Sequence, residues 1–331
     1  MRMVLSITKE EAAKIKEEVD LIKKEISKVF IGQKEIIDNF ITCLLSNGSV
    51  LIEGVPGLGK TLLARTIAKV LGVQFSRIQF TPDLLPTDII GITTYEEGRG
   101  FYVLKGPIFA NIVLADEINR APPKVQSALL EAMQEKQATI SKETFELPKP
   151  FFVLATENPL ESLGTYPLPD AQLDRFLFKI FIGYPSLEEE KQILDTNITS
   201  KKFEDYDLKE VSSADRIIEL QEKLKNVFVD DRIKEYIVKI VDATRNPDKY
   251  KLKLGKYLLY GASPRASIAF YLSSKVDAVT VFGKNYVTPY NVKRVAKHIL
   301  NHRISVNFEG ETEGITPFDI IEEIINKIPV P

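Results

Sequence analysis

Cysteine is nearly absent from this sequence of 331 residues, in which Cys43 is the only one. A single cysteine excludes an internal disulfide, and the apolar neighbours of Cys43 predict a core residue rather than a nucleophile. Long apolar runs are absent too, so we expect no membrane span, and the apolar stretch at residues 1–6 is too short for a signal peptide. Together these absences favour a cytoplasmic location.

A strong net charge is also missing, because 44 basic and 46 acidic residues leave a formal net charge of −2. This balance removes the bulk electrostatic argument for nucleic-acid binding, and only a local basic groove stays open. The hydrophobic share of 44% is ordinary for globular proteins and argues against disorder or a fibrous role. The length suits about two domains.

Short apolar runs alternate with amphipathic stretches up to residue 185, a pattern that is typical of a parallel α/β core. The expected strands are residues 50–52, 75–80, 112–115, 151–155 and 177–181. Several are apolar at consecutive positions, as in strands that helices cover on both faces. We therefore predict an α/β core over residues 1–185, with a charged N-terminal helix at 8–29.

After Pro185 the pattern becomes helical, with Ser186 as a candidate N-cap. The expected helices are residues 214–227, 231–245, 264–281, 289–303 and 317–328. Three of them begin with proline after serine or threonine, which is the usual order of N-cap and first helical residue. The sequence therefore predicts an all-α lid domain over residues 186–331.

The most specific motif is a phosphate-binding loop of the pattern G-x-x-x-x-G-K-[ST]. It consists of Gly54, Val55, Pro56, Gly57, Leu58, Gly59, Lys60 and Thr61. An apolar strand precedes the loop and a helical segment follows it, so backbone N–H groups and a helix N-terminus would face the phosphates. Lys60 would bridge the β- and γ-phosphates of ATP, and the Thr61 hydroxyl would bind Mg²⁺. A plain glycine turn with an exposed lysine is the weaker alternative.

A second candidate site is Asp116-Glu117, directly after the apolar strand at residues 112–115. Asp116 is placed to hold the Mg²⁺ shell, and Glu117 to orient and deprotonate the attacking water. Two adjacent carboxylates at a strand end are poorly tolerated without a cation or solvent. A solvated acidic loop is the alternative, which the nearby phosphate loop disfavours.

These motifs resemble the AAA+ ATPases, and among them the MoxR-type branch. The resemblance rests on the phosphate loop and on four further blocks: residues 80–89 (FTPDLLPTDI), 116–124 (DEINRAPPK), 170–176 (DAQLDRF) and 261–266 (GASPRA). The blocks lie between residues 31 and 303, so the likeness covers most of the chain. It implies a P-loop core with a helical lid, ATP and Mg²⁺ as cofactors, and ATP hydrolysis.

The resemblance also implies roles for polar residues near the nucleotide. Asn158 resembles the sensor-1 residue that helps to place the lytic water, although an Asn-Pro turn is the alternative. The family commonly has glutamine at the position of Glu157. Arg265 resembles sensor 2, acting either within its subunit or across an interface. Gln33 lies in a stretch that resembles the adenine-side segment, for which an ordinary helix-to-loop junction is the alternative.

Two arginines compete for the role of arginine finger, the residue offered to ATP in a neighbouring subunit. Arg175 resembles the finger, and Arg120 lies in a block that also tends to face the subunit boundary. Such a guanidinium neutralises charge on the transferred phosphoryl group. The alternative for either arginine is a structural ion pair with Asp170 or Asp174.

Two β-hairpins are expected within the core, at residues 91–104 and 138–147. In ring assemblies of the clade that this chain resembles, such hairpins point toward the central pore, and idle surface ribbons are the alternative. The resemblance thus implies a ring, by expectation a hexamer, that remodels a protein client. Partners with von Willebrand factor A domains, complex maturation and metal insertion are implied in the same way. Two other classes stay open: a nucleic-acid motor of the MCM type, disfavoured by the charge, and a nucleotide-gated switch or scaffold with slow turnover.

Overall fold

A parallel sheet organises the first part of the chain. The structure, a computed structural model, describes residues 6–98, 100–158, 164–195 and 203–331. Its main sheet has the strand order β2-β5-β8-β1-β9. The strands are β1 (Val50–Glu53), β2 (Phe75–Gln79), β5 (Ile112–Asp116), β8 (Phe152–Glu157) and β9 (Phe178–Phe181). All five strands predicted from the sequence are confirmed, and the apolar runs of β1, β5 and β8 are buried.

Strand order decides which residues meet at the edge of the sheet. β5 is parallel to both β2 and β8, and β8 is parallel to β1. The carboxyl ends of these strands therefore share one edge, where ligands of open α/β sheets bind. Asp116 ends β5, and Asn158 directly follows β8. α3 (Lys60–Val70) packs on β2 and β5, so its first residue starts at the same edge.

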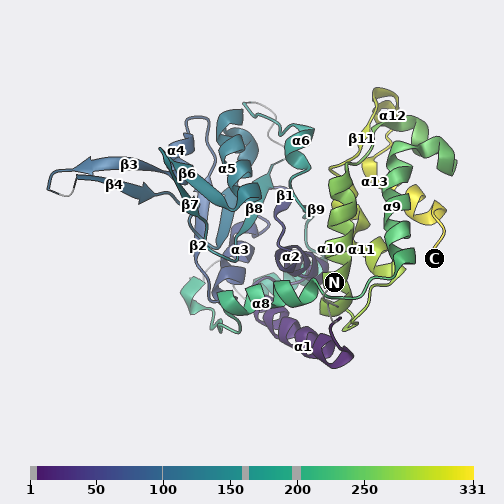
Figure 1. Ribbon diagram of the computed structural model, residues 1–331, viewed down its shortest axis with the longest axis horizontal. Coiled ribbons are helices and arrows are strands. Elements are labelled where there is room, and N and C mark those ends of the chain that lie inside the picture. The colour runs from purple at the N-terminus through teal and green to yellow at the C-terminus, as the bar shows by residue number, and fades with distance from the viewer. Residues whose placement is uncertain (1–5, 99, 159–163, 196–202) are drawn as a thin grey trace, which may run out of the picture. The chain divides into compact units, whose positions relative to one another are not determined.

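Both expected hairpins are present in the core. β3 (Gly91–Glu96) pairs with β4 (Gly100–Lys105), and β6 (Gln137–Ile140) pairs with β7 (Glu143–Glu146), both antiparallel. Figure 1 shows the β3–β4 ribbon extending away from the sheet. The two ribbons approach each other at Thr93 and Ser141, whose hydroxyl oxygens lie 3.0 Å apart. α4 (Pro86–Ile90) precedes the first ribbon, and α5 (Pro123–Glu135) precedes the second.

The remaining helices begin with α1 (Lys9–Ile26), α2 (Lys34–Leu45), α6 (Asp170–Leu173) and α7 (Leu187–Asp195). The predicted lid helices follow as α8 (Ala214–Leu224), α9 (Asp231–Arg245), α10 (Pro264–Thr280), α11 (Pro289–Leu300) and α13 (Pro317–Lys327). Their proline starts are confirmed, because Ser263 and Thr316 accept hydrogen bonds from backbone N–H groups of the first turn. Between them the sequence analysis missed α12 (Phe308–Thr312) and a short ribbon of β10 (Leu258–Tyr260) and β11 (Ser305–Val306). α11 also ends three residues earlier than predicted.

The chain forms two compact units. The core unit contains Asp20–Arg175 and Ile180–Glu219. The lid unit contains the residues up to Val19, together with Phe176–Lys179 and Leu220–Pro331. α7, which follows residue 185, lies in the core unit, and the domain boundary expected at residue 185 stays a prediction.

Two simple expectations can be compared with the described residues. Cys43 is buried in α2 and has a free thiol, as its apolar neighbours predicted. In the described part of the chain, no helix has both the length and the apolar character that a membrane span needs.

Candidate nucleotide-binding site

The phosphate loop connects β1 to α3 and needs glycine where its backbone turns. Gly57 and Gly59 have φ angles of 87° and 75°, a region that residues with side chains rarely adopt. Gly54 is required for a different reason, because a Cβ atom there would lie 2.7 Å from the Ile182 carbonyl oxygen. Gly59 is the N-cap of α3, so the loop ends at a helix N-terminus. Free N–H groups and the helix dipole make this end attractive to an anion.

Lys60 lies at the start of α3 with its ammonium group turned back over the loop. Its Nζ donates a hydrogen bond to the carbonyl oxygen of Gly54. Burial lowers the pKa of Lys60, while the carboxylates of Asp116, Glu117 and Glu53 act in the opposite direction. A half-buried cation thus lies against a backbone carbonyl and near acidic groups, which is an environment that a polyphosphate would complete.

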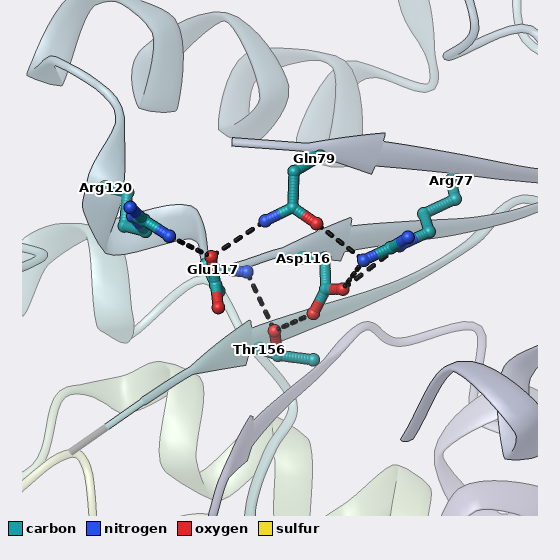
Figure 2. Close-up of polar contacts among 6 residues, drawn as sticks. All are labelled: Arg77, Gln79, Asp116, Glu117, Arg120 and Thr156. Carbon is teal, nitrogen blue, oxygen red and sulfur yellow. Dashed lines mark hydrogen bonds and ion pairs between the residues drawn. The ribbon is translucent and has the colours of Figure 1, made fainter. Parts of the chain in front are cut away.

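Asp116 is the centre of a polar network at the end of β5, drawn in Figure 2. The Thr156 hydroxyl donates to Asp116 Oδ1 at 2.7 Å. Arg77 Nη2 donates to Asp116 Oδ2 at 2.6 Å, and Arg77 Nε donates to the same oxygen at 3.1 Å. Asp116 is therefore fixed between β2 and β8 by one hydroxyl and one guanidinium.

Glu117 is held in a strained backbone conformation. Its φ of 58° places a non-glycine residue in the left-handed region, and its N–H donates to the Thr156 hydroxyl oxygen at 2.8 Å. Gln79 Nε2 and Arg120 Nη1 each donate to Glu117 Oε2 at 2.8 Å (Figure 2). Gln79 and Arg120 thus orient the carboxylate through Oε2, and Thr156 holds the backbone of the same residue. Oε1 takes no part in these contacts.

One cavity brings the predicted nucleotide residues together. Its volume is about 410 Å³, and its lining includes the loop residues from Pro56 to Thr61, the acidic pair Asp116-Glu117, Thr156 and Asn158. Across the described residues, no cluster of three or more His, Cys, Asp or Glu side chains is placed to hold a metal. The cavity instead offers one hydroxyl, Thr61, and one fixed carboxylate, Asp116. This pair fits Mg²⁺, which binds through one or two protein oxygens, substrate phosphates and water.

Asn158 and Gln33 lie in the core unit. Asn158 is buried and lines the cavity, which is where a sensor-1 residue is expected. Gln33 has a left-handed backbone, and its N–H donates to Glu189 Oε1 at 2.8 Å. Its side-chain Nε2 donates to the Gly183 carbonyl at 3.0 Å. Gln33 is therefore fixed by residues that follow β9, and it does not line the cavity.

The three arginines occupy different settings. Arg120 forms an ion pair with Glu117 in its own chain at 2.8 Å. Arg175 is exposed, and its side chain forms no hydrogen bond or ion pair within the described ranges of the chain. Arg265 is exposed in the first turn of α10, in the lid unit.

Sequence reasoning missed Arg77, Gln79 and Thr156. Arg77 and Gln79 are polar residues two positions apart on β2, so their side chains share one face of the sheet. Arg77 Nη2 donates to Gln79 Oε1 at 2.6 Å, which turns the Gln79 amide nitrogen toward Glu117. Thr156 is a buried hydroxyl near the end of an apolar strand. The sequence could have pointed to them through the polar positions Arg77 and Gln79 of β2 and through Thr156, which follows an apolar run in β8.

A larger cavity of about 680 Å³ lies between α3 and residues 203–208. Its cations are already neutralised, because Arg65 pairs with Glu204 at 2.8 Å and Lys69 pairs with Glu210 at 2.7 Å. Arg65 also stacks over the Phe203 ring, with 4.2 Å between the guanidinium carbon and the ring centroid. The smaller cavity is thus the better candidate for a phosphate ligand.

Comparisons with known proteins show the family of this chain. The family described as "ATPase family associated with various cellular activities (AAA)" matches residues 49–178, and the AAA lid domain matches residues 255–324. The chain is 44% identical to Chaperone MoxR1 of Mycobacterium tuberculosis over 310 residues, which is 93% of this chain and 81% of the relative. It is 27% identical to Protein MoxR of Methylorubrum extorquens over 93% of this chain and 94% of that protein.

A solved structure has the same fold as this chain. A crystal structure of a protein from Cytophaga hutchinsonii has a TM-score of 0.91 and 44% identity, and the match covers 97% of this chain and 98% of that one. This chain therefore shares an AAA ATPase domain and an AAA lid domain with known families, and its fold with a solved structure. This chain belongs to the MoxR-type branch of the AAA+ ATPases.

Proposed function

We propose that this protein hydrolyses ATP with Mg²⁺ and uses the cycle to remodel protein clients. The observation that carries the proposal is the single cavity in which the phosphate loop, the acidic pair Asp116-Glu117 and Asn158 lie together. Binding a triphosphate requires the loop, and hydrolysing it requires a base and a polar group beside the γ-phosphate. All three are present at one edge of one sheet.

Each residue has a part in this chemistry. The N–H groups of the loop and Lys60 bind the phosphates and stabilise their negative charge. Thr61 and Asp116 would hold Mg²⁺, which neutralises charge on the β- and γ-phosphates when it is bound. Glu117 accepts a proton from the attacking water, and Asn158 orients that water. Gln79 and Arg120, which bind Glu117 Oε2, decide where that carboxylate points.

A ring assembly, by our proposal a hexamer, would place one subunit's arginine at its neighbour's ATP. Arg175 suits this role better than Arg120, because Arg175 is exposed without a side-chain partner among the described residues. Arg120 is engaged with Glu117 in its own subunit. A guanidinium that reaches the γ-phosphate of a neighbour accelerates phosphoryl transfer by about 10³-fold or more. Arg265 remains a sensor-2 proposal.

The hairpins would contact the protein client and act on it during the cycle of ATP binding and hydrolysis. The β3–β4 ribbon carries exposed aromatic residues, Tyr95 and Phe101, whose rings pack edge to face at 5.2 Å. Exposed apolar side chains on a projecting ribbon are suited to transient contact with a polypeptide. A relative supports this direction, because the similar protein of Mycobacterium tuberculosis is a chaperone, Chaperone MoxR1. A von Willebrand factor A-domain partner, complex maturation or metal insertion, and a cytoplasmic location belong to the same proposal.

Two substitutions test the enzymatic part. Lys60→Ala removes the cation that faces the phosphates and is expected to abolish tight ATP binding, measured with a fluorescent ATP analogue. Glu117→Gln keeps the shape of the side chain but removes the base, so ATP stays bound while phosphate release falls by about 10²-fold or more. Unchanged ATP affinity in the first variant, or normal turnover in the second, would refute the corresponding assignment.

A further inference from the structure

The residues that follow α11 bind the backbone just after Arg175. Asn301, His302 and Arg303 are consecutive and buried, and all three reach the segment Phe176–Lys179 of the same lid unit. Asn301 Nδ2 donates to the Lys179 carbonyl at 2.9 Å. The sequence analysis assigned these three residues to the helix itself, so their contacts with this segment were not foreseen.

Arg303 makes the most extensive contact with this segment. Its Nη2 donates to the Phe176 carbonyl at 2.5 Å, and its Nη1 donates to the carbonyls of Leu177 at 3.2 Å and Ile299 at 2.6 Å. The rigid fork of a guanidinium can bridge adjacent carbonyls in this way, which an ammonium cannot do. A buried charge is costly, and an apolar residue of similar size would fill the space at lower cost. Its hydrogen-bonding geometry therefore calls for a role beyond filling the core.

His302 supports the same carbonyl group. Its Nε2 lies 3.1 Å from the Phe176 carbonyl oxygen, and its Nδ1 lies 2.9 Å from Asn301 Oδ1. Burial, together with the nearby charge of Arg303, holds the pKa of His302 well below its usual range. The ring is thus neutral and donates to only one of these two oxygens. Arg303 donates to the Phe176 carbonyl whichever ring nitrogen of His302 carries the proton.

Arg175 lies between two fixed points. On one side its N–H donates to the Gln172 carbonyl at 3.1 Å, in the turn after α6 of the core unit. On the other side, the carbonyl of the following residue, Phe176, accepts a hydrogen bond from Arg303, and both residues belong to the lid unit. The Arg175–Phe176 bond is also where the chain passes from the core unit to the lid unit. Within residues 172–179, Arg175 is the one residue that is exposed.

We propose that Arg303 is a positioning residue for Arg175, because it fixes the backbone directly after this arginine, which reaches the ATP of a neighbouring subunit. The inference rests on the proposed role of Arg175 as a finger that acts across the interface. Through this contact, the lid unit of one subunit would set the catalytic competence of the next subunit's site. A finger misplaced by about 1 Å is expected to cost about 10²-fold in turnover.

Arg303→Met is the first test, because methionine fills similar space without donors. We expect kcat for ATP hydrolysis to fall by about 10- to 100-fold, while the affinity for a fluorescent ATP analogue stays within about 2-fold. Arg303→Lys keeps the charge and a donor, so its defect is expected to be smaller. Arg294→Met is the matched control, because Arg294 lies on α11, just before Arg303 in the chain, and bonds Asp277 at 3.0 Å instead of the segment Phe176–Lys179. This control should lose stability without losing kcat.

Mixing subunits separates positioning in trans from a structural defect. A site needs Glu117 from the subunit that binds ATP and a well-placed Arg175 from its neighbour. Equal mixtures of Arg175→Ala and Glu117→Gln subunits should therefore regain activity above the sum of the separate samples. Mixtures of Arg303→Met with Glu117→Gln should do the same, because the Glu117→Gln subunit supplies an intact finger. Mixtures of Arg303→Met with Arg175→Ala should gain nothing, because neither subunit supplies one.

The outcomes distinguish the two proposals. If Arg175→Ala is rescued but Arg303→Met is not, Arg303 acts on its own subunit's site, and the positioning role is wrong while the finger stands. If Arg175→Ala is not rescued either, the finger in trans is wrong, and the positioning role falls with it. If the methionine variant fails to fold, the same mixtures are made with Arg303→Lys. A full kcat in a folded Arg303 variant also overturns the inference.

Discussion

Replacing Thr156 with valine removes one oxygen from the network beneath the acidic pair and leaves the side-chain shape almost unchanged. The Thr156 hydroxyl makes two hydrogen bonds, one donated to Asp116 Oδ1 and one accepted from the Glu117 N–H. Thr156 is 1% exposed, so water does not readily replace the hydroxyl. We therefore expect both stability and turnover to suffer in Thr156→Val.

The size of the loss follows from the two contacts. An unsatisfied buried N–H costs about 1–3 kcal/mol, and a hydrogen bond to a charged group contributes about 1.5–3 kcal/mol. The Asp116 side chain keeps its bond to Arg77 and is 16% exposed, so part of the second contribution is recovered. The expected loss in the free energy of unfolding is about 2–4 kcal/mol, measured by urea denaturation.

Turnover should fall for a separate reason. The Glu117 N–H bond helps to hold a left-handed backbone that a glutamate does not prefer. Without it, the carboxylate loses its orientation, and kcat should drop at least about 10-fold, part of the 10²–10⁴-fold that a general base contributes. ATP affinity should change little, because the Thr156 hydroxyl bonds the acidic pair and not the phosphate loop.

Thr66→Val is the matched control. Thr66 is fully buried in α3, and its hydroxyl has no hydrogen-bond partner among the described residues. Removing that oxygen relieves an unsatisfied polar group, so stability should be unchanged or slightly higher. Equal losses in the two variants would refute the reasoning, because the hydrogen bonds of Thr156 would then carry no energy of their own. Thr156→Ser, which retains the hydroxyl, should recover most of the turnover.

Two further predictions concern acid stability and the metal site. Burial lowers the pKa of His298 to about 4, so between about pH 6.5 and pH 4 the unfolded chain takes up a proton that the folded protein does not, and stability falls as pH falls. His298→Gln should reduce this dependence by up to about 1.4 kcal/mol per pH unit in urea denaturation at several pH values, and an unchanged slope would contradict the assignment. The Arg77 guanidinium occupies Asp116 Oδ2, so Arg77→Met should lower the Mg²⁺ concentration needed for half-maximal binding of a fluorescent ATP analogue. Arg65→Met, which breaks an ion pair with Glu204 elsewhere, should leave that concentration unchanged.

The sequence was most informative for features that depend on residues close together in the chain. The phosphate loop needs its glycines, Lys60 and Thr61 at fixed spacing between a strand and a helix. The motif can therefore be recognised from the sequence without any knowledge of the fold. The same holds for the lid helices, whose starts were marked by proline after serine or threonine. The strands were also predictable, because burial on both faces leaves them apolar at consecutive positions.

The contacts that orient the acidic pair could not be predicted in the same way. Arg77 is 39 positions from Asp116 in the sequence, and the two meet only because β2 pairs with β5 in parallel register. Thr156 reaches both acidic residues because β8 is the neighbour on the other side of β5. Strand order is a property of the whole sheet, which no local pattern specifies. The end of α11 is similar, since Arg303 leaves the helix to bind the backbone of a distant segment.

A crystal structure with Mg²⁺ and a non-hydrolysable ATP analogue would test the central claim most directly. We predict that the β- and γ-phosphates lie within hydrogen-bonding distance of the N–H groups from Gly57 to Thr61 and of Lys60 Nζ. Mg²⁺ should lie about 2.0–2.1 Å from Thr61 Oγ1, with Asp116 in its coordination shell directly or through water. Phosphates bound away from this loop, or a metal held by neither Thr61 nor Asp116, would contradict the account.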